Sequence, residues 1–208
     1  MSSALVPVLR RAASKAALGL LALIAGPEAS GRGAPSQALP TATCFALPVA
    51  GYRPHSLLGY LQRNPGYGNR RHVADDYLTP AGTVVTAAAA GRVMYAQAYG
   101  SCPDWGYLIV VEHRLPSGER VSTIYGHARP TVAEGTIVEK GQPIGKVASF
   151  PCWRDHLHFG VARSAYGAPV GVYADWVHGY LLDSEPVEPY TDPIAFVAAH
   201  AECRGGGR

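Results

Sequence analysis

Apolar residues along the chain fall in short runs that alternate with polar residues and are separated by turn residues. The clearest runs lie at residues 83–90, 92–98, 107–112, 120–125 and 156–162, with shorter ones at 136–138 and 141–147. Side chains on an extended strand point alternately to its two faces, so these runs predict β-strands with one or both faces buried. The tripeptide Pro-Ser-Gly at 116–118 separates two of the runs and predicts a hairpin turn.

Helix signals are scarce in this chain. The clearest one covers residues 192–199, where Asp192 can cap the amino-terminal end and Pro193 suits the first helical position. Residues 165–188 are rich in Tyr and Pro and predict an excursion on the surface. The whole pattern therefore predicts a mainly β domain with one short C-terminal helix.

The first 38 residues differ from the rest of the chain. They combine a basic start, an apolar run at 16–26 and small residues at 36–38, in the order typical of a secretory signal peptide. The apolar run is shorter than the roughly 20 residues of a comfortable membrane span. We therefore expect residues 1–38 to be a signal peptide or N-terminal anchor with a linker. The folded domain is expected at 39–203, followed by a disordered tail at 204–208.

This leader predicts a secreted or periplasmic protein, with no stable membrane span after processing. It also changes the charge balance, because it contains four of the 18 basic residues and one of the 15 acidic residues. The mature chain is left with 14 of each and a net charge near zero. No basic field remains to attract nucleic acid, and we expect no nucleic-acid partner.

Four cysteines follow the leader, at Cys44, Cys102, Cys152 and Cys203. An even number of cysteines in an exported chain predicts disulfides, and three pairings are possible. No two of them form a C-x-x-C pair, which argues against a zinc finger.

Three groups of polar residues could carry chemistry. His156 and His158 are two positions apart on a predicted strand, so their side chains share one face, roughly 6.6 Å apart. Both could bind one metal, or one could bind it while the other acts on bound water. His72 and Asp76 offer one nitrogen and one oxygen ligand, both suited to zinc. Full extension would separate these two residues by roughly 13 Å, so a shared ion requires the backbone to curve between them.

The third group is Tyr125-Gly126-His127, at the end of a predicted strand. Taken together, H-x-x-x-D, Y-x-H and H-x-H, in this order with strands between them, resemble the lysostaphin/LytM-type zinc metallopeptidases, a family of peptidoglycan endopeptidases. Further stretches that resemble the family lie at residues 81–93, 105–113, 135–145 and 190–193. The resemblance extends over roughly residues 45–200.

The resemblance implies a fold, a cofactor and a reaction. The fold would be an antiparallel β-sheet sandwich of the duplicated hybrid motif, or barrel-sandwich hybrid, type. One Zn²⁺ ion would be bound by His72, Asp76 and His158, while His156 and His127 act on water and substrate. The reaction would be hydrolysis of peptide bonds in bacterial cell-wall peptidoglycan, whose peptides would be the partner. Ala74 stands where the family usually has Gly, a departure that removes no ligand.

The resemblance also narrows the cysteine pairing. Cys102 and Cys152 precede two strands whose loops border the same cleft in the family, so we expect these two to pair. Cys44 would then pair with Cys203 and join the start of the domain to its end.

Two other functions are compatible with the sequence. One is a catalytically inactive module of the same fold that binds or regulates at the cell wall, in which case ligands should be lost. The other is a carrier domain, because residues 135–145 also resemble biotinyl and lipoyl domains and the glucose-type phosphocarrier. Lys140 and Lys146 are not placed in the tight turn that a lipoyl-type carrier needs, and the leader argues for export.

The remaining polar candidates have simpler interpretations. His113 is expected to be structural, and Asp75 to be solvated or adjacent to the metal ligand. No catalytic motif includes the last three histidines, which are assigned to the surface or to packing: His55, His178 and His200.

Overall fold

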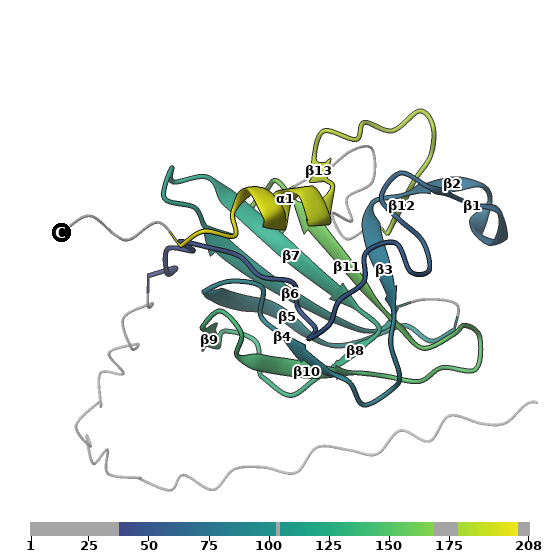
Figure 1. Ribbon diagram of the computed structural model, residues 1–208, viewed down its shortest axis with the longest axis horizontal. Coiled ribbons are helices and arrows are strands. Elements are labelled where there is room, and N and C mark those ends of the chain that lie inside the picture. The colour runs from purple at the N-terminus through teal and green to yellow at the C-terminus, as the bar shows by residue number, and fades with distance from the viewer. Residues whose placement is uncertain (1–37, 103–104, 169–178, 204–208) are drawn as a thin grey trace, which may run out of the picture. The chain divides into compact units, whose positions relative to one another are not determined.

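The computed structural model describes residues 38–102, 105–168 and 179–203, which form antiparallel β-sheets and one α-helix (Figure 1). Four strands form the centre of the largest sheet: β5 (Gly91–Tyr99), β6 (Gly106–Arg114), β7 (Arg120–Gly126) and β11 (His156–Ala162). The shorter strands are β1 (Arg63–Asn64), β2 (Arg70–His72), β3 (Ala74–Leu78), β4 (Val84–Thr86), β8 (Ala128–Pro130), β9 (Ile137–Val138), β10 (Pro143–Val147), β12 (Tyr180–Leu181) and β13 (Tyr190–Thr191). A 3₁₀ turn, Pro65–Tyr67, follows β1, and helix α1 (Pro193–Ala199) ends the domain.

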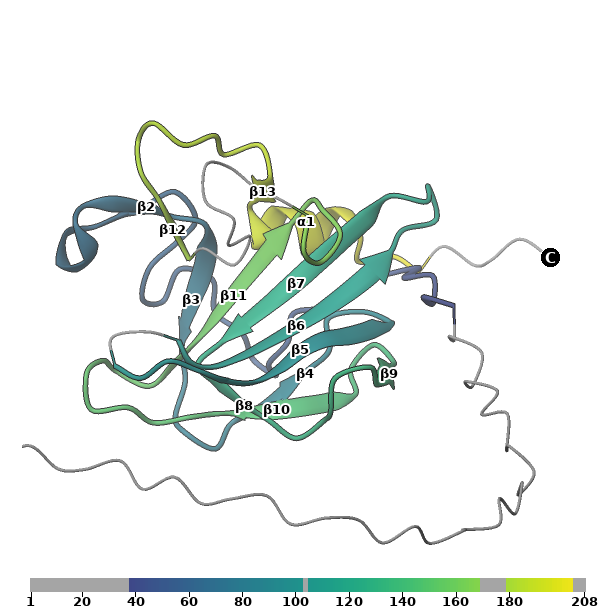
Figure 2. The ribbon, with the colours of Figure 1, turned by 180° about the vertical axis from the view of Figure 1, so that it is seen from behind.

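Two sheets enclose the main core. The seven-stranded sheet has the order β13-β11-β7-β6-β5-β9, with β3 also paired to β11. A three-stranded sheet of order β4-β10-β8 lies beneath it in both ribbon views (Figures 1 and 2). Apolar side chains of both sheets meet in one cluster, which includes Val85, Ile109, Tyr125, Ile144, Leu157 and Phe159. The mainly β fold expected from the sequence is therefore confirmed.

Strand β4 is shorter than the sequence pattern predicts. It ends at Thr86, and the backbone of the next residues bonds to loops and side chains in place of a neighbouring strand. The amide of Ala87 donates to the Gln142 carbonyl, and the amide of Ala88 donates to the Tyr125 hydroxyl at 2.8 Å. Apolar residues 87–89 are buried as residues of a central strand would be, but their backbone groups bond outside the strand ladder.

A buried polar chain anchors this segment to β6 and β7. The Tyr125 hydroxyl lies 2.9 Å from Thr123 Oγ1, which lies 2.8 Å from His113 Nε2. His113 Nδ1 donates to the Ala90 carbonyl at 2.9 Å. Burial lowers the pKa of His113 to about 4, against a weaker opposing effect of this hydrogen bond, so the ring is neutral at pH 7. The expected structural role of His113 agrees with this arrangement.

Helix α1 begins where the sequence predicts. Asp192 Oδ1 accepts hydrogen bonds from the amides of Ile194 and Ala195 at 2.8 and 3.2 Å, and Pro193 occupies the first position. The helix buries Phe196 against Phe45, whose rings meet edge to face at 5.0 Å. The start and the end of the domain are thereby packed together.

Both expected disulfides are present. Cys44 is bonded to Cys203, and Cys102 is bonded to Cys152. No helix in the described part of the chain is long and apolar enough to cross a membrane. The leader up to residue 37 and the tail at 204–208 lie outside the described residues, so both stay predictions.

Candidate metal centre

The three residues expected to bind metal come from three different strands. Asp76 on β3 lies directly opposite His158 on β11 in the antiparallel register, which brings their side chains to one place. His72 ends β2, which belongs to a small sheet of order β1-β2-β12. The chain passes from this small sheet into the large one at Val73, whose amide donates to the Gly179 carbonyl. This change of sheet provides the curvature that the spacing of His72 and Asp76 requires.

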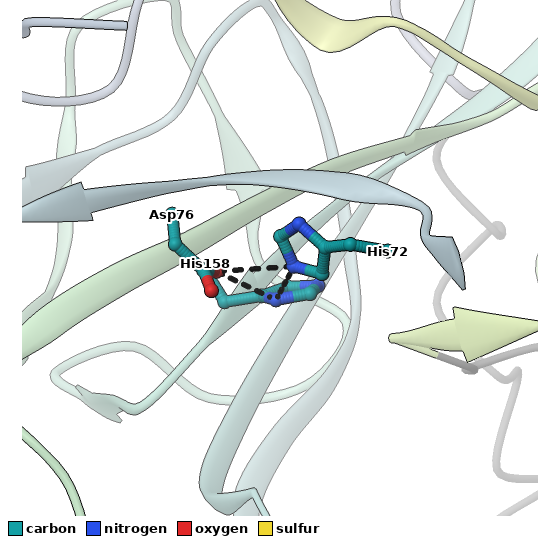
Figure 3. Close-up of side chains that lie close together, drawn as sticks. All are labelled: His72, Asp76 and His158. Atoms are coloured by element: carbon teal, nitrogen blue, oxygen red, sulfur yellow. Dashed lines mark hydrogen bonds and ion pairs between the residues drawn. The ribbon is translucent and has the colours of Figure 1, made fainter. Parts of the chain in front are cut away.

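The ligand atoms of the three side chains form a nearly equilateral triangle, shown in Figure 3. His72 Nε2 lies 3.0 Å from His158 Nδ1 and 3.2 Å from Asp76 Oδ1, and the third side measures 3.0 Å. Ligands at 2.0–2.1 Å from a common tetrahedral zinc ion are about 3.3 Å apart. All three side chains are buried. The spacing of their ligand atoms therefore has the size of a zinc site.

Hydrogen bonding and charge also suit a cation. His72 Nδ1 donates to the Gly59 carbonyl at 3.2 Å, which leaves the lone pair of Nε2 facing the triangle. Asp76 Oδ1 is buried, and no hydrogen bond of acceptable geometry reaches it. Burial opposes ionisation of Asp76, yet His72 and His158 hold its pKa well below the usual range. A carboxylate whose buried oxygen has no donor, beside two imidazoles, is a donor set that fits Zn²⁺.

His158 is poised as a neutral ligand. Burial lowers its pKa to about 4, while its contact with Asp76 acts in the opposite direction. The ring is held in place by Trp105, which meets it edge to face at a centroid distance of 4.7 Å. Sequence reasoning missed this tryptophan, because nothing in its local pattern indicates that it packs against a residue 53 positions away.

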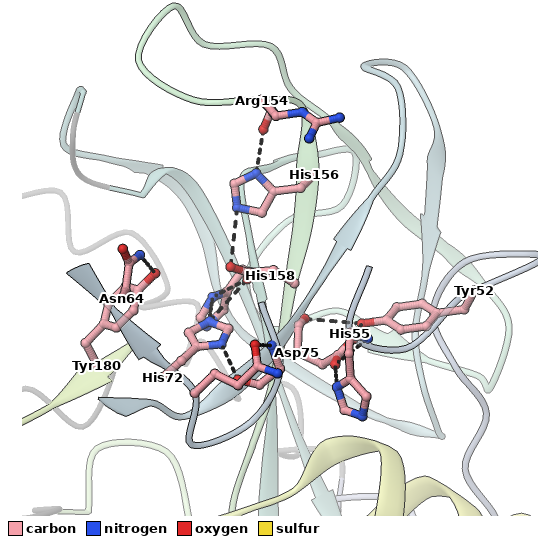
Figure 4. Close-up of polar contacts among 12 residues, drawn as sticks. Tyr52, His55, Asn64, His72, Asp75, Arg154, His156, His158 and Tyr180 are labelled. Atoms are coloured by element: carbon pink, nitrogen blue, oxygen red, sulfur yellow. Dashed lines mark hydrogen bonds and ion pairs between the residues drawn. The ribbon is translucent and has the colours of Figure 1, made fainter. Parts of the chain in front are cut away.

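Two further histidines lie beside the triangle, with ring centroids 4.5 Å apart. His156 Nδ1 donates to the Arg154 carbonyl at 2.6 Å, a bond visible in Figure 4, and its Nε2 lies 3.9 Å from Asp76 Oδ2. His127 Nδ1 donates to the Trp105 carbonyl at 3.0 Å. In the described part of the chain, neither ring makes a hydrogen bond through Nε2.

The backbone at His127 is unusual. Its φ of 61° lies in the left-handed region, which non-glycine residues adopt rarely and often at functional sites. The residue before it must be glycine, because a Cβ on Gly126 would lie 2.4 Å from the Trp105 ring and 3.0 Å from His158 Cβ. Burial, followed by the neighbouring His156 and His158, lowers the pKa of His127 to about 3. The Y-x-H motif thus places a neutral imidazole next to the triangle.

Asp75 was expected to be solvated or adjacent to the metal ligand, and the structure contradicts the first of these. It is fully buried and points away from the triangle, where it accepts hydrogen bonds from the Tyr52 hydroxyl at 3.0 Å and the His55 amide at 2.9 Å. His55 Nδ1 also lies 2.5 Å from Asp75 Oδ2 (Figure 4). These contacts bind the segment that carries His55 to β3. The next residues of that segment pair with the ligand strands, Leu58 with Asp76 and Leu61 with His72.

The triangle opens into a cleft of about 570 Å³. His127 and His156 line its floor, and one wall contains Trp105, Trp153 and Cys152, so the disulfide to Cys102 borders the cleft as expected. Further lining residues come from the small sheet and the turn after β1: Asn64, Pro65, Gly66, Tyr67, Arg70 and Tyr180.

Tyr180 corrects one expectation. Its segment was expected to be a surface excursion, but Tyr180 pairs in β12 and faces the cleft beside His72. Two other aromatic residues of that segment, Tyr173 and Trp176, lie outside the described residues, as does His178.

Comparison with known proteins identifies the family. A protein-family model described as "Peptidase family M23" matches residues 70–171, a range that contains all five site residues. The chain belongs to peptidase family M23. The family resemblance seen in the sequence motifs is therefore confirmed, and this chain is an enzyme of the M23 type with a candidate metal site.

Two solved structures show the same fold as this M23 peptidase. The catalytic domain of the antimicrobial peptidase lysostaphin from Staphylococcus simulans has 23% identity and a TM-score of 0.51, over 71% of this chain and 92% of that domain. A longer lysostaphin structure from the same organism has 22% identity and a TM-score of 0.53, over 76% of this chain. The M23 peptidase spans only 54% of that longer protein. A search of curated proteins finds no match.

Proposed function

We propose that this M23 peptidase is an exported, zinc-dependent endopeptidase that hydrolyses peptide bonds in bacterial peptidoglycan. The observation that carries the proposal is the convergence of His72, Asp76 and His158 at the floor of an open cleft, next to two histidines whose Nε2 atoms make no hydrogen bond in the described part of the chain. Three protein ligands leave a fourth position for water or substrate, which is the arrangement of catalytic zinc sites.

The chain's own groups divide the remaining work. Zinc, when bound, would polarise the scissile carbonyl and make water a better nucleophile. His156 Nε2 points toward the same space and would accept the proton of the attacking water, since its Nδ1 is committed to the Arg154 carbonyl. His127 is held in the matching tautomer by the Trp105 carbonyl. Its Nε2 therefore presents a lone pair, which favours assisting proton transfer over donating to the oxyanion.

The two alternative functions lack support from the described residues. An inactive module should have lost a ligand, and all three ligand positions are filled by suitable side chains. A lipoyl-type carrier needs an exposed lysine in a tight turn. Lys140 instead directs its Nζ to the sulfur atoms of Cys44 and Cys203, and Lys146 lies within β10.

Export is supported by the cysteines and by the leader pattern. All four cysteines are bonded, in a chain whose start resembles a secretory signal. Disulfides persist in oxidising compartments, so a secreted or periplasmic location suits this domain.

Purified protein incubated with isolated peptidoglycan tests the proposal. Mass spectrometry of the soluble products should show muropeptides with newly formed amino termini, and metal analysis should show about one zinc per chain. A chelator should stop the release, and added zinc should restore it. Fragments that arise only from broken glycosidic bonds, without new amino termini, would show that the endopeptidase assignment is wrong.

A further inference from the structure

The wall of the cleft beside His72 is a continuous stack of rings that ends in a guanidinium group. The ring of His72 lies 5.1 Å from that of Tyr180, and Tyr180 stacks on Tyr67 at 4.7 Å. The Arg70 guanidinium lies over the Tyr67 ring at 5.5 Å. These three contacts connect His72, a candidate metal ligand, to the positive charge of Arg70. The distance between the two is a few residues of extended peptide.

Asn64 is hydrogen-bonded to two parts of this stack. Asn64 Nδ2 donates to the Tyr180 hydroxyl at 2.8 Å, and its Oδ1 accepts from the Gly66 amide at 3.0 Å at the start of the 3₁₀ turn. Figure 4 shows Asn64 and Tyr180 bonded together beside His72. These two hydrogen bonds fix the hydroxyl of Tyr180 and the start of the turn that carries Tyr67.

Three arginines lie on the β1–β2 hairpin, and two of them have internal partners. Arg63 pairs with the Asp183 carboxylate at 2.8 Å. Arg71 donates to the carbonyls of Leu182 and Glu185 at 2.7 and 2.6 Å. These contacts tie the hairpin to the segment after β12.

Arg70 differs from both. Within the described part of the chain, no carboxylate pairs with it, and its only described interaction is with the Tyr67 ring. Arg70 and His72 are two positions apart on β2, so their side chains share one face, and Arg70 lines the cleft. The only carboxylate among the described lining residues is that of Asp76, which the metal site uses. Among the described residues, the cleft lining therefore includes one positive charge, that of Arg70, with no carboxylate paired to it.

We propose that Arg70 is a specificity residue that binds a carboxylate of the substrate peptide a few residues from the scissile bond. The inference rests on the proposed function for its substrate, a cell-wall peptide. Guanidinium groups are always charged and bind carboxylates through two parallel hydrogen bonds, so they distinguish a carboxylate from the amide of the same shape. The Tyr67 ring beneath the guanidinium restricts its motion and leaves its edge available.

Two sources could supply this carboxylate, the free chain end of a peptide or a carboxylate within it. A set of muropeptide dimers distinguishes them: one dimer with all carboxylates free, one amidated only at chain ends, and one amidated only at internal carboxylates. Hydrolysis of each is measured with wild type, Arg70→Gln and Arg70→Lys. Arg53→Gln is the matched control, because Arg53 is exposed, loses the same charge, and is not among the cleft-lining residues.

Wild type should cleave the free-carboxylate dimer about tenfold more efficiently, in kcat/KM, than the dimer amidated at the recognised position. A tenfold preference corresponds to about 1.4 kcal/mol. Arg70→Gln should remove this preference by slowing only the carboxylate substrate, Arg70→Lys should retain part of it, and Arg53→Gln should keep it. Equal cleavage of all three dimers by wild type, or an equal loss on all three in Arg70→Gln, overturns the inference.

Binding of the same dimers to the His156→Ala variant, followed by tryptophan fluorescence, separates this inference from the proposed function. A carboxylate preference in binding that disappears when Arg70→Gln is added supports the inference even if wild type hydrolyses none of the dimers. In that event only the proposed function fails. Absence of any binding preference, or a preference that survives Arg70→Gln, overturns the role of Arg70 whether or not hydrolysis occurs.

Discussion

Each histidine of the site is oriented by a contact that the motif does not contain. His72, His127 and His156 donate from Nδ1 to the carbonyls of Gly59, Trp105 and Arg154. These bonds select the tautomer with its proton on Nδ1, which leaves the lone pair of Nε2 available. Metal binding and proton acceptance both require that lone pair. His158 is oriented differently, by the Trp105 ring and by its register opposite Asp76.

Two single substitutions should separate metal binding from proton transfer. His158→Ala removes one of the three ligands, so zinc content should fall from about one ion per chain to near zero.

His156→Ala leaves the three ligands intact, so zinc should remain while the rate of peptidoglycan hydrolysis falls by about 10² to 10⁴. Metal analysis and product release, measured on both variants, check the two outcomes. Unchanged zinc in His158→Ala would refute the ligand assignment, and the parent rate in His156→Ala would refute the role of His156 as base.

Among the elements, β6 and β7 supply core residues and also hydrogen-bond partners for a neighbouring segment of backbone. They carry His113, Thr123 and Tyr125, whose polar chain provides partners for the irregular backbone at 88–90. Gly91 permits this approach, because a Cβ there would lie 2.5 Å from the Glu112 carbonyl oxygen and 2.6 Å from His113 Nδ1. Without these partners, the backbone groups after β4 would be buried without hydrogen bonds, at a cost of about 1–3 kcal/mol each.

The buried His113 predicts a pH dependence of stability. Its pKa is about 4 in the folded protein and 6.5 when exposed, so between these values the unfolded chain binds a proton that the folded chain does not. The contribution of neutral His113 to the free energy of unfolding is complete above pH 6.5 and is lost as pH falls toward 4. Between pH 7 and pH 5 this group alone should cost about 2 kcal/mol.

Urea unfolding at pH 7 and pH 5, with a chelator present throughout, measures this effect. His113→Gln should lower the free energy of unfolding at both pH values but reduce its difference between them by about 2 kcal/mol. The chelator excludes loss of metal as the cause. An identical pH difference in the variant and in wild type would show that His113 is not the group responsible.

At the scale of the whole molecule, the two disulfides act on different parts. Cys44–Cys203 joins residues 159 positions apart and closes the domain where Phe45 packs on α1. Cys102–Cys152 joins two loops 50 positions apart and borders the cleft. The first therefore serves the fold, while the second also positions a wall of the site.

Paired substitutions to serine should reveal this division. Loss of Cys44–Cys203 should lower the free energy of unfolding by up to about 5 kcal/mol and leave KM for peptidoglycan fragments unchanged. Loss of Cys102–Cys152 should cost up to about 4 kcal/mol and also raise KM, because Cys152 lines the cleft. Denaturant unfolding and steady-state kinetics measure the two effects. A rise in KM for the first pair, or none for the second, would contradict the assignment.

Local pattern was sufficient for several features of this protein. The alternation at 156–162 predicts β11 with the observed bounds, and Asp192 with Pro193 predicts the start of α1, because strand alternation and helix capping depend on neighbouring residues. The five candidate site residues were proposed from three motifs whose combination resembles the M23 family, and the structure brings these residues together. Their action on a metal and a substrate stays a prediction.

Other features depend on contacts between residues far apart in the sequence. The register that sets Asp76 opposite His158, the burial of Asp75 by Tyr52 and His55, and the packing of Trp105 on His158 have no local signal. The position of Arg70 likewise requires Tyr180, 110 residues away, to support Tyr67 beneath it. Residue types and spacing thus specify which groups can react. Sheet pairing and close packing determine where those groups point and which charged side chain has no internal partner. Both depend on the three-dimensional neighbours of each side chain.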